Sequence, residues 1–444
     1  MSKRKHAAVS ARHSLESGNP ATDASISRNR ESSDFASYNV IEWQSREFVR
    51  TLSEEKLPRR EKLQARAYAV TGKFPVIDQG QSEIAGWTND ESLVIDDGFP
   101  YIVFGDHTRS FKYVDKPFVL GADGTQLLKP SHEYCPRFFY YACLQLDLPS
   151  RGYNRHFTFL KEKSLPLPPQ PEQERIAAIL WTVQRAISTQ DGLIAATADL
   201  KASVMQRLFT HGLRGEALKD TEIGLMPESW ALTTIDDIGT IGAGGTPSRG
   251  SPEFWNGGTI PWVKTGEVDY GIILDSEEKI TPLGLHNSAA KLLPKGTLLV
   301  AMYGQGVTRG KVAILGIDAA TNQACASIRV DKSKVCVEFM LHVLAHGYER
   351  LRGLAHGGQQ QNLNADLIRG FAFGYPVDAG EQRAIADALA TLDRKLAHHR
   401  AKRASLHSLF QTLLHQLMTA QIRVDGLKID TSDIRAPAVQ GEQA

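Results

Sequence analysis

The sequence predicts an α+β fold, in which two mixed α/β domains are each followed by one long helix and the two helices pack together as a coiled coil. Three observations support this prediction: a direct repeat, an apolar stripe in both copies of the repeat, and short strand patterns before each copy. The chain has 444 residues, which is enough for two domains with connecting elements. Hydrophobic residues make up 42%, as in globular proteins with a buried core.

The repeat is the strongest pattern in the chain. Glu172-Gln173 recurs as Glu381-Gln382, an offset of 209 residues. The alignment continues without a gap to Arg214 in the first copy and Arg423 in the second. Such a repeat predicts one structural unit that is used twice.

Both copies carry apolar residues at alternating spacings of three and four, which places them on one face of a helix. The predicted seam consists of Ile176, Leu180, Val183 and Ile187 in the first copy and Ile385, Leu389, Leu392 and Leu396 in the second. The stripe is interrupted at Gln190, and at His399 with Arg403. Two matching seams in one chain favour packing of the helices against each other. The alternative is two separate amphipathic helices, each packed on its own domain.

Residues typical of helix ends lie at both ends of the first copy of the repeat. Pro171 suits a helix start, and Gly212 suits a helix end. A helix of about 43 residues would be about 65 Å long. Gly192 is expected to be a weak point or a kink within it.

Each predicted helix follows a segment rich in strand and turn patterns. Five apolar runs read as short strands: 74–78, 101–105, 116–120, 297–302 and 311–316. Residues 1–34 contain no aromatic side chain and are expected to form a disordered tail. The predicted segments are a tail at 1–34, a first head at 35–169, a first helix at 170–215, a second head at 216–376, a second helix at 377–425 and a flexible tail at 426–444.

Composition excludes several classes of protein. The chain has 51 Lys and Arg against 50 Asp and Glu, so any binding of a polyanion must come from local patches. None of the four cysteines forms a C-x-x-C pair, which argues against a zinc ribbon or a redox motif and fits a reduced cytoplasm. We expect no membrane span and no secretory signal, because no apolar run has the required length and no apolar region follows the basic start.

No enzyme motif survives inspection. The run from Gly304 to Val312 resembles a phosphate-binding loop, but it has one residue too many between its outer glycines, and Val312 replaces the Ser or Thr that would hold magnesium. Glu277 and Glu278 with Asp269 form an acidic pattern that a solvated turn explains better than a nuclease site. Gly242-Ala-Gly-Gly lacks the context of a dinucleotide fold. The sequence therefore favours binding over catalysis.

The whole pattern resembles the specificity subunits of type I restriction-modification systems. The resemblance covers residues 35–425 and is carried by sets of residues around each head. Before the first helix the set is Leu165-Pro-Leu-Pro-Pro-Gln-Pro-Glu-Gln-Glu-Arg-Ile176, and in the first head it is Pro75 to Gly80, Phe104 to Arg109 and Gly152 to Arg155. In the second head it is Gly244 to Ser248, Ile260 to Val263, Gly304 to Val312, Asn322-Gln323 and Gly358 to Asn362.

This resemblance implies a non-catalytic subunit. Each head would be a target recognition domain that reads one half of a bipartite site in double-stranded DNA, and the two helices would pack antiparallel and set the unread spacer. Two methyltransferase subunits would dock on the assembly, and restriction subunits could join. Adenine methylation and DNA cleavage would belong to those partners, which would bring S-adenosylmethionine, ATP and magnesium, so that this chain itself holds no cofactor and no metal.

Candidate DNA-binding residues are long polar side chains in glycine-rich loops. Arg suits guanine O6 and N7, and Gln or Asn suits adenine N6 and N7. The predicted base readers are Gln79, Thr108, Arg109, Asn154 and Arg155 in the first head and Arg249, Gln305, Thr308, Arg309, Gln359, Gln360 and Gln361 in the second. The predicted phosphate contacts are Lys73, Lys112, Lys264 and Lys311. A solvated loop or a structural turn is the competing explanation for each of them.

Two other functions stay open at this point. One is a coiled-coil scaffold that binds proteins and no DNA, which explains the seams but not two different heads with polar loops. The other is an active nuclease or methyltransferase, which the missing motifs disfavour.

Overall fold

The computed structural model describes residues 43–149, 156–304, 307–355 and 362–435. The predicted N-terminal tail lies outside these residues. The described part of the first head contains two main sheets, with strand orders β3-β2-β7-β4 and β6-β5-β8, besides the strand pair β1-β9. Their strands are β2 (Phe74–Ile77), β3 (Gly86–Thr88), β4 (Val94–Ile95), β5 (Tyr101–Gly105), β6 (Phe111–Val114), β7 (Phe118–Leu120) and β8 (Thr125–Leu128).

The second head also contains two main sheets, with strand orders β13-β20-β17-β18-β15 and β16-β14-β19. Their strands are β13 (Gly239–Ala243), β14 (Ile260–Val263), β15 (Ile272–Ile273), β16 (Glu278–Ile280), β17 (Leu298–Ala301), β18 (Val312–Leu315), β19 (Ala320–Thr321) and β20 (Cys325–Val330). The five predicted strands are confirmed as β2, β5, β7, β17 and β18.

The two heads share one pairing pattern although their sequences differ. In the first head β2 pairs antiparallel with β3 and parallel with β7, and β5 pairs antiparallel with both β6 and β8. In the second head β14 pairs antiparallel with β16 and parallel with β19, and β17 pairs antiparallel with both β18 and β20. The chain therefore repeats its heads as well as its helices.

Shorter elements complete each head. In the first they are β1 (Gln44–Glu47), α1 (Pro136–Leu144), α2 (Phe157–Lys161) and β9 (Ser164–Leu167). In the second they are β10 (Leu218–Thr221), β11 (Gly224–Pro227), β12 (Trp230–Thr234), α4 (Ile235–Ile238), α5 (Pro282–His286), α6 (Val337–His346), α7 (Tyr348–Gly353), α8 (Ala365–Arg369) and β21 (Ala372–Pro376). Helix α1 contacts both β6 and α3, and α6 contacts both β18 and α9.

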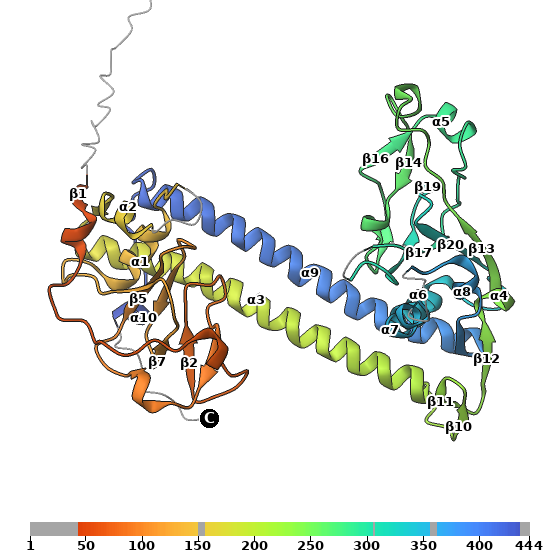
Figure 1. Ribbon diagram of the computed structural model, residues 1–444, viewed down its shortest axis with the longest axis horizontal. Helices are drawn as coiled ribbons and strands as arrows, with labels where there is room; N and C mark the ends of the chain where they lie inside the picture. Colours follow the sequence, from red (N-terminus) through yellow and green to blue (C-terminus); the bar gives the residue numbers. More distant parts are fainter. Residues whose placement is uncertain (1–42, 150–155, 305–306, 356–361, 436–444) are drawn as a thin grey trace, which may run out of the picture. The chain divides into compact units, whose positions relative to one another are not determined.

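The long helices are α3 (Gln170–His211) and α9 (Ala379–Met418), which run side by side in Figure 1. Lys201 near the end of α3 is 2.5 Å from Asp393 in the first half of α9. Glu172 at the start of α3 is 2.7 Å from Arg423, just beyond the end of α9. The helices are therefore antiparallel, as expected, and α3 continues through Gly192 without a break.

Five of the eight predicted seam residues are buried, and the seam has two kinds of neighbour. Ile176, Leu180, Ile385, Leu389 and Leu396 are buried. The other three predicted seam residues, Val183, Ile187 and Leu392, are half-buried. Ile385 and Leu389 also belong to the core of the second head, where they pack with residues of α6 and with Leu208 of α3. The apolar face of α9 therefore packs partly on the second head, through Ile385 and Leu389, while α3 and α9 also contact each other.

A local two-fold symmetry relates the two copies of the repeat. Gln190 and His399 occupy equivalent positions, and Gln190 Oε1 lies 3.0 Å from His399 Nδ1. Equivalent residues of antiparallel helices can meet only close to a two-fold axis. Asp191 pairs with Arg403 beside them. The interruption of the apolar stripe is therefore the polar centre of the helix pair.

Each long helix is tied to its own head by the glutamine of the repeated Glu-Gln. Gln173 Oε1 accepts a hydrogen bond from Cys135 N at 2.7 Å, and Gln173 Nε2 donates to Glu133 O and Pro168 O. Gln382 makes the equivalent bonds, accepting from Cys336 N at 2.9 Å and donating to two backbone carbonyl groups, those of residues 334 and 376. Both glutamines are 1% exposed. They satisfy the backbone at the N-terminal ends of α1 and α6.

The glutamate of the same motif ties each helix to the end of the other. Glu172 pairs with Arg423 through both of its carboxylate oxygens, at 2.7 and 2.9 Å. Glu381 pairs with Arg214 at 3.2 Å, which is the same contact in the other copy. Both carboxylates are buried, so each ion pair stabilises one orientation of the antiparallel helices.

The C-terminal segment differs from the expectation. Residues 426–444 were predicted to be a flexible tail, but Ser432–Arg435 form a short helix, α10, that packs on α3. Asp433 pairs with Arg185 at 2.6 Å, and Arg435 pairs with Glu174 at 2.5 Å. Ion pairs to a distant helix hold a segment whose own sequence has no apolar periodicity. Residues 436–444 lie outside the described residues.

Substituting either junction glutamine should destabilise the protein strongly. Gln173→Ala and Gln382→Ala each leave a buried N–H group and buried carbonyl groups without partners, so the free energy of unfolding should fall by about 2–4 kcal/mol. Urea unfolding followed by circular dichroism measures this. Gln411→Ala, at an exposed position of α9, is the control and should change the value by less than about 0.5 kcal/mol. Equal effects of the three substitutions would contradict the assigned role.

The junction of the second head should make stability depend on pH. Burial lowers the pKa of His342 to about 4, with Asp393 raising it and Lys201 lowering it. The unfolded chain therefore binds a proton at this residue between about pH 6.5 and 4 while the folded chain does not, so stability falls as the pH falls through that range. Unfolding titrations should show a shallower decline for His342→Gln, whereas His407→Gln at an exposed position should retain the wild-type slope.

Candidate nucleic-acid interface

Strand pairing gathers the polar loops of the second head at one edge. Ala243 ends β13 opposite Ala326, and Ala301 ends β17 opposite Cys325. Val263 ends β14 beside the end of β19. Loops 244–251, 264–270, 302–311 and 322–324 therefore emerge together, and their described residues are called the second recognition edge below.

Backbone hydrogen bonds join these loops to one another. Gly245 N donates to Thr321 O at 2.8 Å, and Asn322 N donates to Val263 O at 3.1 Å. A Cβ on Gly245 would lie 2.3 Å from Ala289 C, so only glycine allows this close approach. The second recognition edge is thus fixed by the backbone, with its polar side chains left to project from it.

The first head has the equivalent edge. Ile77 and Leu120 end the parallel strands β2 and β7 as neighbours, and Gly105 ends β5 opposite Thr125. Asp106 N donates to Gly124 O at 2.7 Å, which joins the loops after β5 and β7. Loops 78–82, 106–110 and 121–124 form the first recognition edge.

Three of the predicted readers of the first head lie at this edge. Thr108 Oγ1 donates to Gln79 O, and Gln79 Oε1 accepts from His107 N at 3.4 Å. Arg109, at φ +62°, donates from Nη1 to Leu148 O at 2.7 Å. These bonds hold the loops together. The predicted readers Asn154 and Arg155 lie outside the described residues. His156 N donates to Asp106 O at this edge.

Arg109 also borders an open cleft of about 660 Å³ between the first recognition edge and the end of α1. Tyr113 and Tyr140 line its wall together with Asp115 and Lys116. The rings of Tyr113 and Tyr140 contact each other edge to face, with centroids 5.8 Å apart. An aromatic wall with nearby charges gives this edge both apolar and polar groups for contact.

In the second head, Arg249, Thr308 and Arg309 lie at the second recognition edge. Thr308-Arg309 occupies the loop between β17 and β18, which corresponds to the loop of Thr108-Arg109 between β5 and β6. This equivalence of the two Thr-Arg pairs becomes visible only through the shared topology. The predicted readers Gln305, Gln359, Gln360 and Gln361 lie outside the described residues.

The predicted phosphate contacts divide into different environments. Lys264 lies 2.7 Å from Glu277 and 3.2 Å from Glu278, and Lys311 lies 2.7 Å from Asp269, so both are at the second recognition edge within ion pairs. Their contact with phosphate stays a prediction.

The structure corrects the prediction of a phosphate contact for Lys112 and for Lys73. Lys112 is 7% exposed, and its Nζ donates to Ser82 O at 2.5 Å, so it braces the loop after β2 from inside. Burial lowers the pKa of Lys112, and Asp78 opposes that shift. Lys73 precedes β2 and pairs with Glu91 at 2.5 Å, at the end of the strand opposite the recognition edge. Neither lysine is placed to contact a phosphate beside the other candidates.

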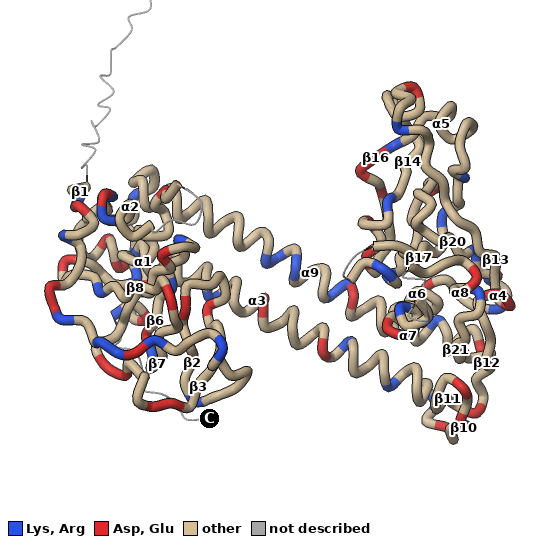
Figure 2. Tube along the Cα trace, viewed as in Figure 1, with Lys and Arg blue, Asp and Glu red and all other residues tan. Residues whose placement is uncertain are grey.

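Charges of both signs are interspersed over the described parts of both heads, as Figure 2 shows. The net charge is +1, so attraction of a polyanion must act locally. Within the described ranges, no group of three or more His, Cys, Asp or Glu side chains is arranged to hold a metal ion. No helix of the described residues is both long and apolar enough to cross a membrane.

Comparison with known proteins identifies the family. The family model "Type I restriction modification DNA specificity domain" matches residues 56–196 and 227–408, so each match contains most of one head and part of the helix that follows it. The chain belongs to this family. Its two heads are the two DNA specificity domains that the fold repeats.

Two relatives and one solved structure agree with this assignment. The chain is 24% identical over 352 residues to the specificity subunit of the type I restriction enzyme EcoR124I/EcoR124II of Escherichia coli, covering 77% of this chain and 85% of the relative. It is 30% identical over 192 residues to the MjaIX specificity subunit of Methanocaldococcus jannaschii, covering 42% and 43%. The fold matches a type I S subunit from M. genitalium with a TM-score of 0.60 at 18% identity, covering 86% of this chain and 97% of that one.

Membership of the specificity family decides between the functions that the sequence left open. The chain is a DNA specificity subunit of a type I restriction-modification system, and such subunits are not themselves catalytic. The hypothesis of a scaffold without DNA binding has no support from these relatives.

Substituting a lysine at the recognition edge and substituting a buried lysine should have different effects on the salt dependence of DNA binding. Removing a lysine that contacts phosphate lowers the slope of log K against log salt concentration by about 1. In the assembled complex with its target duplex, Lys311→Met should show this change, because Lys311 lies at the second recognition edge. Lys112→Met should leave the slope unchanged while lowering the melting temperature. A reduced slope for Lys112→Met would show that its side chain reaches the DNA.

Proposed function

We propose that each head reads one half of a bipartite site in double-stranded DNA, and that the antiparallel pair of α3 and α9 sets the length of the unread spacer. The observation that carries this proposal is the repeated junction. One head topology occurs twice, and Gln173 and Gln382 attach the two copies to the starts of two antiparallel helices through equivalent bonds. A protein with two-fold symmetry of this kind suits a target of two halves.

Each long helix is longer than one turn of DNA. A continuous helix of about 40 residues is roughly 60 Å long, whereas one turn of DNA rises about 34 Å. The first head packs at the start of α3, and residues of α3 near Leu208 pack in the core of the second head. Two recognition surfaces on one rigid spacer bind a duplex more tightly than either alone, provided that the spacing matches.

Base reading itself belongs to the recognition edges. The major groove shows a distinct pattern of donors and acceptors for each base pair, which polar side chains on fixed loops can distinguish. Arg109, Arg249 and Arg309 are the arginines among the predicted readers that the structure describes there. Since net charge is close to zero, phosphate attraction contributes less than in a basic DNA-binding domain, and the subunit acts most effectively inside a larger complex.

That complex contains two methyltransferase subunits and can contain restriction subunits. The repeat supports this stoichiometry because it presents equivalent residues of α3 and α9 twice, so two copies of one partner can dock in the same way. The partners supply adenine methylation and cleavage together with S-adenosylmethionine, ATP and magnesium, and this chain holds none of these. The assembly works on DNA in the cytoplasm.

Sequencing of modified DNA tests the proposal. The chain is co-expressed with the methyltransferase subunit of its own system in a host without DNA methylation, and modified adenines are mapped. We expect a split motif of two short specified halves around a fixed gap. Replacing residues 35–169 by the first head of a relative should change one half and leave the other half and the gap unchanged.

The control is the unswapped chain expressed without the methyltransferase subunit, which should give no modified bases. A continuous, unsplit motif would contradict the two-headed arrangement. A head exchange that changes both halves would contradict the assignment of one half to each head.

A further inference from the structure

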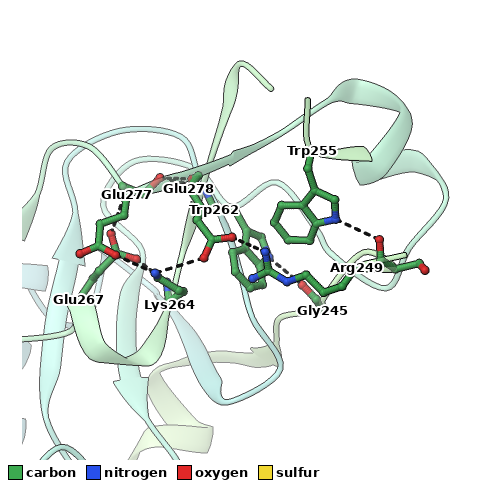
Figure 3. A network of polar contacts seen from close by, with 10 residues as sticks. Gly245, Arg249, Trp255, Trp262, Lys264, Glu267, Glu277 and Glu278 are labelled. Carbon is green, nitrogen blue, oxygen red and sulfur yellow. Dashed lines mark hydrogen bonds and ion pairs between the residues drawn. The ribbon is translucent and has the colours of Figure 1, made fainter. Parts of the chain in front are cut away.

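An exposed arginine at the second recognition edge lies on a shelf of two tryptophans (Figure 3). The guanidinium carbon of Arg249 is 3.8 Å from the centroid of the Trp255 ring and 5.0 Å from that of Trp262. The two rings meet edge to face, with centroids 5.1 Å apart and an angle of 88°. Stacking on an aromatic face fixes the plane of a guanidinium group.

The shelf and the arginine are locked to the same loop. Trp262 Nε1 donates to Gly245 O at 2.9 Å, and Trp255 Nε1 donates to Ser248 O at 3.0 Å. Both acceptors belong to loop 244–251, which also carries Arg249. Trp262 is 2% exposed and forms part of a buried cluster, so the shelf is anchored in the core. The loop therefore presents Arg249 in a preorganised position.

One carboxylate holds the guanidinium group in the absence of DNA. Arg249 Nη1 donates to Glu278 Oε2, and Glu278 Oε1 lies 3.2 Å from Lys264 Nζ. Arg249 and Lys264 lower the pKa of Glu278, so this carboxylate is charged. Glu267 completes the network by accepting from Lys264 N at 2.7 Å. The Arg249 side chain remains 53% exposed despite these contacts.

These contacts match the requirements for reading guanine. The O6 and N7 atoms of guanine are two acceptors side by side in the major groove, which a planar guanidinium group binds through two parallel N–H groups. A carboxylate also presents two acceptors side by side. Glu278 accepts from Arg249 through Oε2 only, and its Oε1 lies beside Lys264, so this carboxylate stands in for one of the two acceptors that guanine would offer.

We infer that Arg249 determines specificity for one guanine in the half-site read by the second head, and that Trp255 is the residue that positions it. This inference rests on the proposed function, because it assigns one base of the half-site to one side chain. Glu278 then serves as the internal acceptor that guanine replaces.

Modified-base sequencing of variants tests this assignment. Arg249→Ala and Arg249→Lys are each co-expressed with the methyltransferase subunit, and the motifs are compared with the wild type. We expect one G·C position in one half to lose specification while the other half and the gap stay unchanged. Trp255→Ala should relax the same position more weakly. Arg369→Ala is the control, because the Arg369 side chain is 43% exposed and pairs with Asp366 and Asp236 of the same head away from the edge, and its motif should not change.

A binding measurement with an altered base gives a second readout that does not depend on a variant folding. The guanines of the half-site read by the second head are replaced one at a time by 7-deazaguanine, which lacks the N7 acceptor. The wild-type complex should bind the duplex altered at the assigned position about tenfold more weakly. The Arg249→Ala complex should bind altered and normal duplexes equally.

The outcomes separate this inference from the function on which it rests. If the wild type gives a split motif but Arg249→Ala keeps every specified base and only lowers occupancy, Arg249 contacts the backbone and the inference is wrong. It is also wrong if no 7-deazaguanine weakens wild-type binding by more than about twofold, or if that half-site holds no G·C pair. Absence of any split motif in the wild type would overturn the proposed function and the inference together.

Discussion

The buried glutamine at the start of each long helix is the contact on which the architecture depends. Gln173 and Gln382 each satisfy a backbone N–H group at the start of a short helix and two backbone carbonyl groups around it. Such a side chain accepts little displacement, because every lost bond would leave a buried polar group without a partner. The orientation of each head on its helix is thus set by geometry that is specific for glutamine. The neighbouring glutamates, paired with Arg423 and Arg214, then fix the second helix against the first.

The repeated scaffold is not identical in its two halves. At the junction of the first head, Tyr141 donates to Gln184 at 2.7 Å and contacts the ring of Phe410. The equivalent positions of the second junction hold His342, Asp393 and Lys201, and Lys201 lies 2.5 Å from Asp393. The first junction thus has a neutral, partly aromatic contact where the second junction has an ion pair. Because these two charged groups are only partly exposed and each is the other's partner, a segment moved from one half to the other would bring one charge without its partner, although the backbones of the two halves correspond.

Sequence reasoning recovered what repeats along the chain and missed what depends on contacts between distant segments. The offset of 209 residues located both long helices, and the apolar runs located strands such as β5 and β17. Burial of Lys112 could not be predicted, because the atoms that surround its ammonium group come from a separate loop after β2. The helix α10 escaped notice because it has only four residues and is held by ion pairs to α3. The recognition edges depend on parallel pairing of strands that are far apart in sequence, which no local pattern reveals.

Three cations at the second recognition edge, Arg249, Lys264 and Lys311, are paired with carboxylates, and this arrangement bears on how DNA would be discriminated. Lys264 and Lys311 each lie within 2.7 Å of a carboxylate oxygen, and Arg249 shares Glu278 with Lys264. The phosphates of an unmatched DNA sequence would approach carboxylates beside these cations. Binding of such DNA would therefore gain little free energy. On the function proposed above, a matching groove would offer base acceptors in place of these carboxylate oxygens. Specificity in this head would then arise as much from the weakness of unmatched binding as from the strength of the matched contact.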